Sequence, residues 1–202
     1  MNVPAPLRKH YSFKQINMSI STVQLIKEVL TEAKGQTYDY GCVMLYFKFP
    51  DQKKIHKLIQ EDDIYTEEAD RSYGLEDEPH TTLLYGLHDT VSLKDVKSVL
   101  DKFTYSTCEL YNASLFDNDK YDVLKFDVRG PELKATNKAL SEFPFTSDYP
   151  DYHPHLTIGY IKKGLGKKYT HLLKGMKYNL LPWKAVYSMP DGTKHNIKIN
   201  VD

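Results

Sequence analysis

Two short stretches of the chain carry the same pattern of reactive side chains. Residues 79–83 read Pro-His-Thr-Thr-Leu and residues 154–158 read Pro-His-Leu-Thr-Ile, so each contains His-x-Thr followed by an aliphatic residue. Histidine titrates near neutral pH, and a pair of histidines can therefore divide acid–base work, one removing a proton while the other donates one. The pattern indicates a site for proton transfer.

Both stretches run into aliphatic residues that are typical of a buried strand. Side chains alternate along a strand, so His80 and Thr82 should share one face, as should His155 and Thr157. Polar pairs on apolar strands are costly to bury unless they are satisfied or used. We therefore expect the two pairs to face each other across one cleft.

His-x-Ser/Thr alone is a weak signal, because composition predicts about one chance match in this chain. Four are present, at His10, His80, His88 and His155. Only His80 and His155 have proline before the histidine and an aliphatic residue after the threonine. They lie 75 residues apart, which suits one copy in each half of a pseudo-twofold fold.

The chemistry that suits these residues is cleavage of a 3′–5′ phosphodiester through the neighbouring ribose 2′-OH. One histidine would deprotonate the 2′-OH and the other would protonate the leaving 5′ oxygen. The hydroxyls of Thr82 and Thr157 could donate to the non-bridging phosphate oxygens, where charge builds up. The sequence does not assign the base to either histidine, and no metal or other cofactor is required.

A metal site is the alternative reading of the same histidines. His80, His153 and His155 would supply three nitrogen ligands, as in catalytic zinc sites. That reading gives the two threonines no purpose, and no HExxH motif is present. His153 is better interpreted as a loop residue at the mouth of the cleft.

Three further residues are candidates for binding nucleobases. Tyr46 is expected on the non-core face of the first strand, and Trp183 on a closing strand; both could stack on bases. A core position suits Trp183 equally well. Glu76 could bind a base edge or simply close its loop. Lys48 shares the face of Tyr46 and could meet a phosphate.

Length and composition indicate an ordinary globular protein of 202 residues. Lys plus Arg and Asp plus Glu both number 27, so the net charge is zero, which argues against a protein that coats long nucleic acid. The two cysteines, Cys42 and Cys108, suggest no disulfide framework. With no signal peptide or long apolar run, we expect a cytoplasmic protein and no membrane partner.

The hydrophobic pattern predicts a mixed α+β fold, with helices on the outer faces of a curved sheet. Residues 1–17 are expected to form an arm or a disordered start, and residues 18–202 a single bilobal domain. The acidic segment 61–78 could be a solvated loop or a lid. Tyr85 and Tyr160 have the opposite strand parity to the histidines and should pack away from the cleft. Helices are predicted near 20–34, 51–60, 92–103, 131–143 and 166–174, with Ser92 as the cap of the third. Strands are predicted near 42–49, 80–86, 105–116, 121–129, 155–161, 178–188 and 194–201.

The two motifs resemble those of the 2H phosphoesterase superfamily, and the segment 73–87 is similar to the phage anti-CBASS cyclic-oligonucleotide phosphodiesterases. The resemblance implies pseudo-twofold related lobes, with curved, mostly antiparallel sheets around a central groove and helices outside. It implies catalytic roles for His80, Thr82, His155 and Thr157, a 2′,3′-cyclic phosphate intermediate and linear 3′-phosphate products. The expected substrate is a cyclic di- or trinucleotide, cleaved in the host bacterial cytoplasm to evade defence.

Two other functions fit the same residues. One is a 2H hydrolase that acts on linear RNA ends or on 2′,3′-cyclic phosphates. The other is a non-catalytic sponge that binds cyclic nucleotides without turnover, which two intact motifs disfavour. Base preference, ring size and oligomeric state are not predicted.

Overall fold

The computed structural model describes residues 38–68, 70, 72–147 and 151–202. The predicted arm and the predicted helix at 20–34 lie outside the described residues. Within them, no helix is both long and apolar enough to span a membrane.

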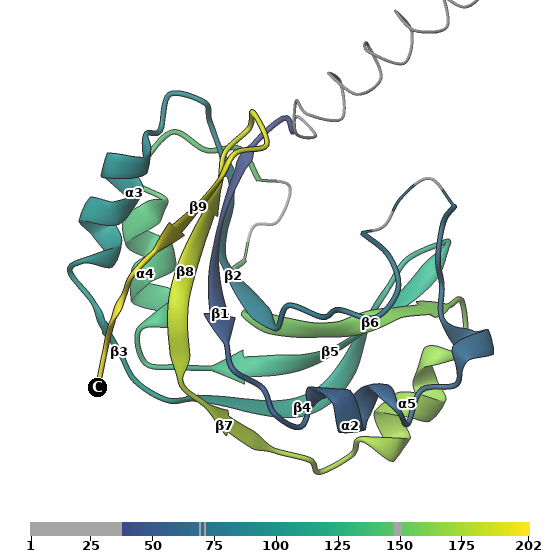
Figure 1. Cartoon of the computed structure of the whole chain (residues 1–202). Coiled ribbons are helices and arrows are strands. Elements are labelled where there is room, and N and C mark those ends of the chain that lie inside the picture. Colours follow the sequence, from purple (N-terminus) through teal and green to yellow (C-terminus); the bar gives the residue numbers. More distant parts are fainter. Residues whose placement is uncertain (1–37, 69, 71, 148–150) are drawn as a thin grey trace, which may run out of the picture. The chain divides into compact units, whose positions relative to one another are not determined.

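Two four-stranded antiparallel sheets form the body of residues 38–202 (Figure 1). In each sheet, the strand that carries a His-x-Thr motif lies at one edge: β2 in the first sheet and β6 in the second. The first sheet has the order β2 (His80–Leu87), β1 (Gly41–Phe47), β8 (Pro182–Ser188) and β9 (Lys194–Ile197). The second has the order β6 (His155–Lys162), β5 (Tyr121–Arg129), β4 (Cys108–Asp117) and β7 (Tyr178–Leu180). A small parallel pair joins β10 (Asn200–Val201) to β3 (Thr104–Tyr105).

The helices lie on the convex side of these curved sheets, as Figure 1 shows. Helices α3 (Leu93–Leu100) and α4 (Leu133–Leu140) cover the first sheet, and α2 (Gln52–His56) and α5 (Gly166–Leu172) lie beside the second. A short 3₁₀ helix, η1, spans Glu61–Asp63. The predicted α+β fold, with helices outside curved antiparallel sheets, is confirmed.

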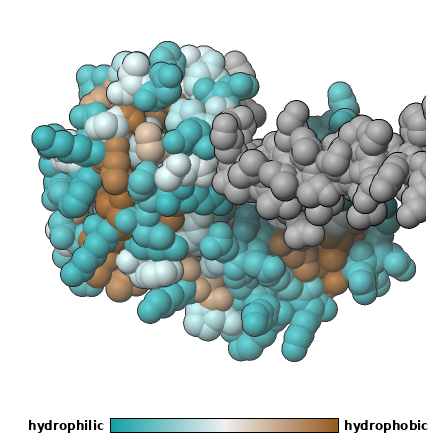
Figure 2. Space-filling view, turned by 45° about the horizontal axis from the view of Figure 1, so that its top comes forward, coloured by the Kyte–Doolittle hydropathy of each residue, from teal (hydrophilic) through white to brown (hydrophobic). Residues whose placement is uncertain are grey.

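Alternation along the strands places the core between sheets and helices. Val43 and Leu45 of β1 and Leu83 of β2 are completely buried. Ser92 starts α3 with a reciprocal capping box to Asp95, as its position before the apolar repeat suggested. Elsewhere hydrophilic side chains predominate on the face shown in Figure 2, around smaller apolar patches.

The predicted single strand at 178–188 is wrong. The chain forms β7, which pairs with β4, and then β8, which pairs with β1, so this stretch passes from one sheet to the other. Leu181 lies exposed between the two strands. The predicted strand at 194–201 is likewise divided into β9 and β10, which belong to different sheets. A strand-like sequence pattern does not reveal a change of pairing partner.

The segment before the first motif pairs with the strand of the second. Residues 74–76 lie beside β6, where the Glu76 amide donates to the Ile158 carbonyl at 3.0 Å. The Tyr160 amide donates to the Gly74 carbonyl at 2.8 Å. This part of the acidic loop therefore extends the second sheet and is held there by backbone hydrogen bonds.

The segment before the second motif makes the reciprocal contact with β2. In residues 144–146, the Thr146 amide donates to the Gly86 carbonyl at 2.9 Å, and the His88 amide donates to the Pro144 carbonyl at 3.0 Å. The His88 ring also bonds the Thr146 hydroxyl. We call these two contacts, of 74–76 with β6 and of 144–146 with β2, the crossed pairing.

Glycine is required where each lead-in backbone meets the opposite strand. Gly86 has φ of +105°, and an added Cβ would lie 1.9 Å from the Thr146 carbonyl oxygen. At Gly159 the same atom would lie 3.0 Å from the Gly74 oxygen. No side chain larger than hydrogen fits at Gly86 without displacing the crossed pairing.

The crossed pairing predicts a large stability loss for Gly86→Ala. The matched control is Gly164→Ala, which has φ of +82° but nothing within 4 Å of the added Cβ. The control should lose about 1 kcal/mol from backbone strain alone, and Gly86→Ala at least about 2 kcal/mol more. Urea unfolding measures the free energy of unfolding of each variant. The loss for Gly159→Ala should lie between those for Gly164→Ala and Gly86→Ala. Equal losses in all three variants would show that the close approach does not matter.

Candidate active site

The first motif presents its polar pair on the face of β2 opposite the core. His80 and Thr82 are half-buried, whereas Thr81 and Leu83 between and after them are completely buried. His80 lies opposite Tyr46 of β1 in the antiparallel register. The alternation expected from the sequence therefore holds through Thr82.

The second motif repeats this arrangement on β6. His155 and Thr157 are half-buried, and Leu156 between them is completely buried. Across the sheet, His155 lies opposite Asp127 and Thr157 opposite Lys125 on β5. These polar partners form the face of the second sheet that bears the motif.

The motif faces lie opposite the buried faces of β2 and β6, and the sheets curve so that this uncovered side is concave (Figure 1). The helices cover the other side, and β2 and β6 contact each other directly. The rings also interact electrostatically, since a positive charge on His80 lowers the pKa of His155. The fold thus brings together two histidines that are far apart in the chain.

Each histidine ring is held in the same way by its own lead-in segment. The Nδ1 of His80 donates to the Glu78 carbonyl at 2.7 Å, and the Nδ1 of His155 donates to the His153 carbonyl at 2.9 Å. A carbonyl only accepts, so in the neutral ring the proton resides on Nδ1. Nε2 of each ring is then the atom that can take up or release a proton.

His80 rests on the ring of Tyr46. The two rings stack with centroids 5.3 Å apart and planes inclined by 25°. The Lys184 ammonium lies 4.8 Å from the centre of the Tyr46 ring, and Tyr46 is only 6% exposed. Burial, together with the charges of Glu78 and Glu76, raises the Tyr46 pKa to about 12. In this structure Tyr46 supports His80, and its role as a base platform stays a prediction.

His155 is half-buried beside Phe116 and the ion pair of Lys125 with Asp127. The ring of His155 packs edge to face against the ring of Phe116, with the ring centroids 4.7 Å apart. Burial lowers the pKa of His155, the His153 carbonyl opposes this effect, and the charge of Lys125 lowers the pKa further. The neutral ring is therefore favoured at pH 7.

Lys125 is itself buried beside the second motif. Its ammonium pairs with Asp127 at 2.5 Å and donates to the Ser114 hydroxyl at 2.9 Å. Burial raises the pKa of Asp127, but hydrogen bonds from Lys125 and Asn112 outweigh it and lower the pKa overall. Lys125 and Asp127 lie two residues apart on β5, so strand alternation places them on one face, but only the pairing of β5 with β6 reveals that this face carries the second motif.

The thiol nearest the site is not a nucleophile. Burial raises the pKa of Cys42 to about 12, and a hydrogen bond with Thr82 only partly opposes this. Cys42 and the buried Cys108 are both free, as predicted. A thiol with so high a pKa remains protonated at neutral pH, so Cys42 supplies packing and not covalent chemistry.

The expectation that Tyr85 and Tyr160 pack away from the site is wrong. Both motif strands change register after the threonine, because Leu83 and Ile158 are extra residues without a direct partner. Tyr85 therefore lies opposite Cys42, on the same face as His80. A bulge of one residue moves every later side chain to the other face.

On the second sheet, the bulge places Tyr160 in a cluster of four tyrosines. Tyr73 lies 5.2 Å from both Tyr65 and Tyr160, and Tyr121 lies 5.0 Å from Tyr65, measured between ring centroids. The cluster joins the acidic segment to the beginning of β5 and to β6. It was missed because strand parity placed Tyr160 on the wrong face.

The other two predicted base-binding residues lie in different settings. Trp183 is 47% exposed, which makes the core reading wrong, and the ammonium groups of Lys48 and Lys184 lie 5.7 and 4.7 Å from its ring. Glu76 accepts a hydrogen bond from the Glu78 amide at 2.9 Å. Glu76 therefore closes the turn that leads to His80.

The metal alternative gains no ligand cluster from the fold. Among the residues described, no three His, Cys, Asp or Glu side chains come together as ligands would. His153 is exposed, and its carbonyl holds the ring of His155. Its position before the second motif suits the predicted place at the mouth of the site.

A comparison with models of protein families shows which family the chain belongs to. The model of "Anti-CBASS protein Acb1" matches residues 44–177, which is well over half of the chain and includes both motifs. The chain belongs to this family. Membership in the Acb1 family confirms the resemblance that the motifs suggested. No curated protein matches the chain.

Two solved structures resemble the fold. Usb1 of Kluyveromyces marxianus with uridine monophosphate has a TM-score of 0.51 and 9% identity, and the match covers 80% of this chain and 98% of that one. A crystal structure of a phosphoesterase has a TM-score of 0.45 and 12% identity, covering 80% and 96%. At such identity the Usb1 likeness concerns the fold alone, and no argument rests on the second structure.

The electrostatics predict that Lys125→Met raises the pKa of His155. The substitution removes a positive charge that disfavours the protonated ring and leaves Asp127 unpaired, which favours it, so both effects have the same sign. NMR titration of the ring resonances should give a pKa higher by about one pH unit. Lys125→Arg keeps the charge and is the control. A fall in the Lys125→Met pKa would contradict this account of the site.

Proposed function

We propose that this protein is a metal-independent phosphodiesterase that opens the 3′–5′ linkages of cyclic di- or trinucleotides, and so allows a phage to evade nucleotide-triggered defence. The observation that carries the proposal is the matched geometry of His80 and His155. Each ring projects from a motif strand on the concave face, with Nδ1 bonded to the carbonyl two residues earlier. Family membership supports the biological setting.

The proposed reaction has two steps. Nε2 of one histidine takes the proton of the 2′-OH, the 2′ oxygen attacks phosphorus, and the bond to the 5′ oxygen breaks as the other histidine protonates it. A 2′,3′-cyclic phosphate results. In the second step one histidine takes a proton from water, the water oxygen attacks phosphorus, and the bond to the 2′ oxygen breaks as the other histidine protonates that oxygen, which leaves a linear 3′-phosphate end.

Neutral side chains can stabilise the charge that develops on the phosphate. Thr82 and Thr157 follow the histidines on the same faces, so their hydroxyls are suited to donate to the non-bridging oxygens. The exposed Trp183, with lysines near its ring, supports a role in stacking on a base beside the first sheet.

Removal of either histidine should abolish most cleavage. We expect His80→Ala and His155→Ala each to lose about 10²- to 10⁴-fold in kcat, and Thr157→Val about 10²-fold. Circular dichroism should show that the variants remain folded. His171→Ala, an exposed helix residue, is the control and should keep full activity. Full activity in either motif histidine variant would refute the mechanism.

Substrates with altered 2′ positions test the nucleophile. A cyclic dinucleotide with 2′-deoxyribose at the cleaved linkage should resist, as should one whose 2′ oxygen is already esterified, because neither can supply the attacking oxygen. Ready hydrolysis of the deoxy substrate would exclude 2′-OH attack. Activity should survive excess EDTA, whereas a loss that added zinc restores would favour the metal alternative.

A panel of substrates separates the remaining functions. Cyclic dinucleotides, cyclic trinucleotides and linear RNA with 2′,3′-cyclic ends are incubated with the protein without metal, and the product ends are identified. We expect the cyclic oligonucleotides to be cleaved fastest. Preference for the linear ends would favour the RNA hydrolase. Tight binding without turnover would favour the sponge.

A further inference from the structure

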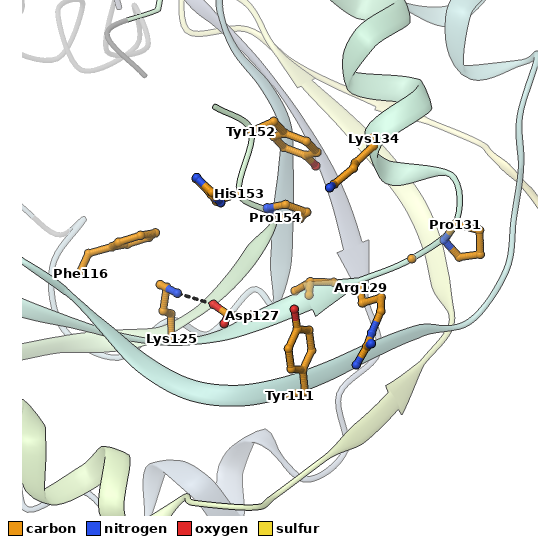
Figure 3. Close-up of a pocket in the computed structure, with 12 residues that line it drawn as sticks. Tyr111, Phe116, Lys125, Asp127, Arg129, Pro131, Lys134, Tyr152, His153 and Pro154 are labelled. Atoms are coloured by element: carbon orange, nitrogen blue, oxygen red, sulfur yellow. Dashed lines mark hydrogen bonds and ion pairs between the residues drawn. The ribbon is translucent and has the colours of Figure 1, made fainter. Parts of the chain in front are cut away.

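A cavity of about 570 Å³ opens on the second sheet beside the second motif (Figure 3). Its size lies in the range of pockets that hold small ligands. The lining combines aromatic rings with cations, and the residues used below are Tyr111, Arg129, Lys134 and Tyr152. None of the four belongs to the His-x-Thr motifs.

The cavity is continuous with the site at His155. Asp127 lines it and lies directly opposite His155 on the neighbouring strand. Phe116, whose ring meets that of His155, lines it as well. Arg129 is two residues beyond Asp127 on the same face of β5, about 7 Å further from the histidine. A group bound near Arg129 is thus separated from the reacting phosphate by a distance that one nucleotide can bridge.

The surroundings of the cavity carry excess positive charge. Lys125 is balanced by Asp127, but Arg129 and Lys177 share the single carboxylate of Glu109, at 2.8 and 3.2 Å. Lys134 is exposed, and Figure 3 shows its ammonium end turned toward Tyr152 within the cavity. The cavity thus offers an anion cations from two separate elements, Arg129 of β5 and Lys134 of α4.

Aromatic rings provide the second kind of contact. The guanidinium of Arg129 lies 4.5 Å from the centre of the Tyr111 ring, an arrangement that offers a flat surface for a base. The Tyr152 hydroxyl donates to the Thr82 carbonyl at 3.0 Å, which ties this wall of the cavity to the first motif strand. The cavity is therefore fixed relative to both motifs.

We propose that this cavity binds a second nucleotide of the substrate, with the phosphate that is not cleaved between Arg129 and Lys134 and its base against Tyr111. The inference rests on the proposed function and deepens it. Binding in the cavity orients the substrate, since the scissile phosphate lies at the histidines and the next phosphate lies toward β4 and α4. Only substrates with more than one phosphate can make both contacts.

Charge reversal on α4 tests the proposal. Lys134→Glu should weaken binding of a 2′-deoxy cyclic dinucleotide, which resists cleavage, by at least about tenfold in a calorimetric titration. Lys138→Glu changes the same charge one turn further along the helix, at an exposed residue outside the cavity lining, and should change the Kd less than about twofold.

Cleavage kinetics provide a second readout. Lys134→Glu should raise the KM for a cyclic dinucleotide at least about tenfold more than the KM for a diribonucleoside monophosphate, which has only the scissile phosphate. Equal increases in KM for both substrates, or equal effects of Lys134→Glu and Lys138→Glu on binding, would overturn the proposed role of the cavity. Failure of the proposed function looks different. The unmodified protein would then bind the cyclic analogue, with the same sensitivity to Lys134→Glu, and would cleave nothing.

Discussion

The crossed pairing is the contact on which the site depends. Residues 74–76 pair with β6 and residues 144–146 pair with β2. The segment that leads into each motif is therefore held by the strand of the other motif. The carbonyls that hold the two histidine rings belong to Glu78 and His153, which follow these contacts along the chain. Backbone hydrogen bonds between the lobes therefore restrict the separation and the orientation of the two rings, which proton transfer to one phosphate requires.

Equivalent backbone positions do not make the two histidines equivalent. His80 stacks on Tyr46, which has the ammonium of Lys184 over its ring, whereas His155 packs against Phe116, which has the ammonium of Lys125 over its ring. Similar local sequences thus produce the same ring tautomer, and the neighbouring strands give each ring its own electrostatic setting. Such a difference suits a pair in which one ring must be neutral while the other is protonated.

The sequence predicted those features that depend on local pattern. Period-two alternation correctly placed the motif residues up to Thr82 and Thr157, and the capping residue Ser92 was also identified. Alternation failed beyond them, because the bulges at Leu83 and Ile158 shift the register without an unambiguous signal in one sequence. The break before Pro182, the crossed pairing and the cavity beside His155 depend on contacts between segments distant in the chain, which periodicity cannot reveal.

The central claim is that the two histidines move protons while the ribose 2′ oxygen attacks the phosphorus. Time-resolved ³¹P NMR of a cyclic dinucleotide with this protein, in the presence of a chelator, observes the phosphate ends directly. The account predicts that a 2′,3′-cyclic phosphate appears first and then decays to a 3′-phosphate. The appearance of a 5′-phosphate end as the first product would contradict it.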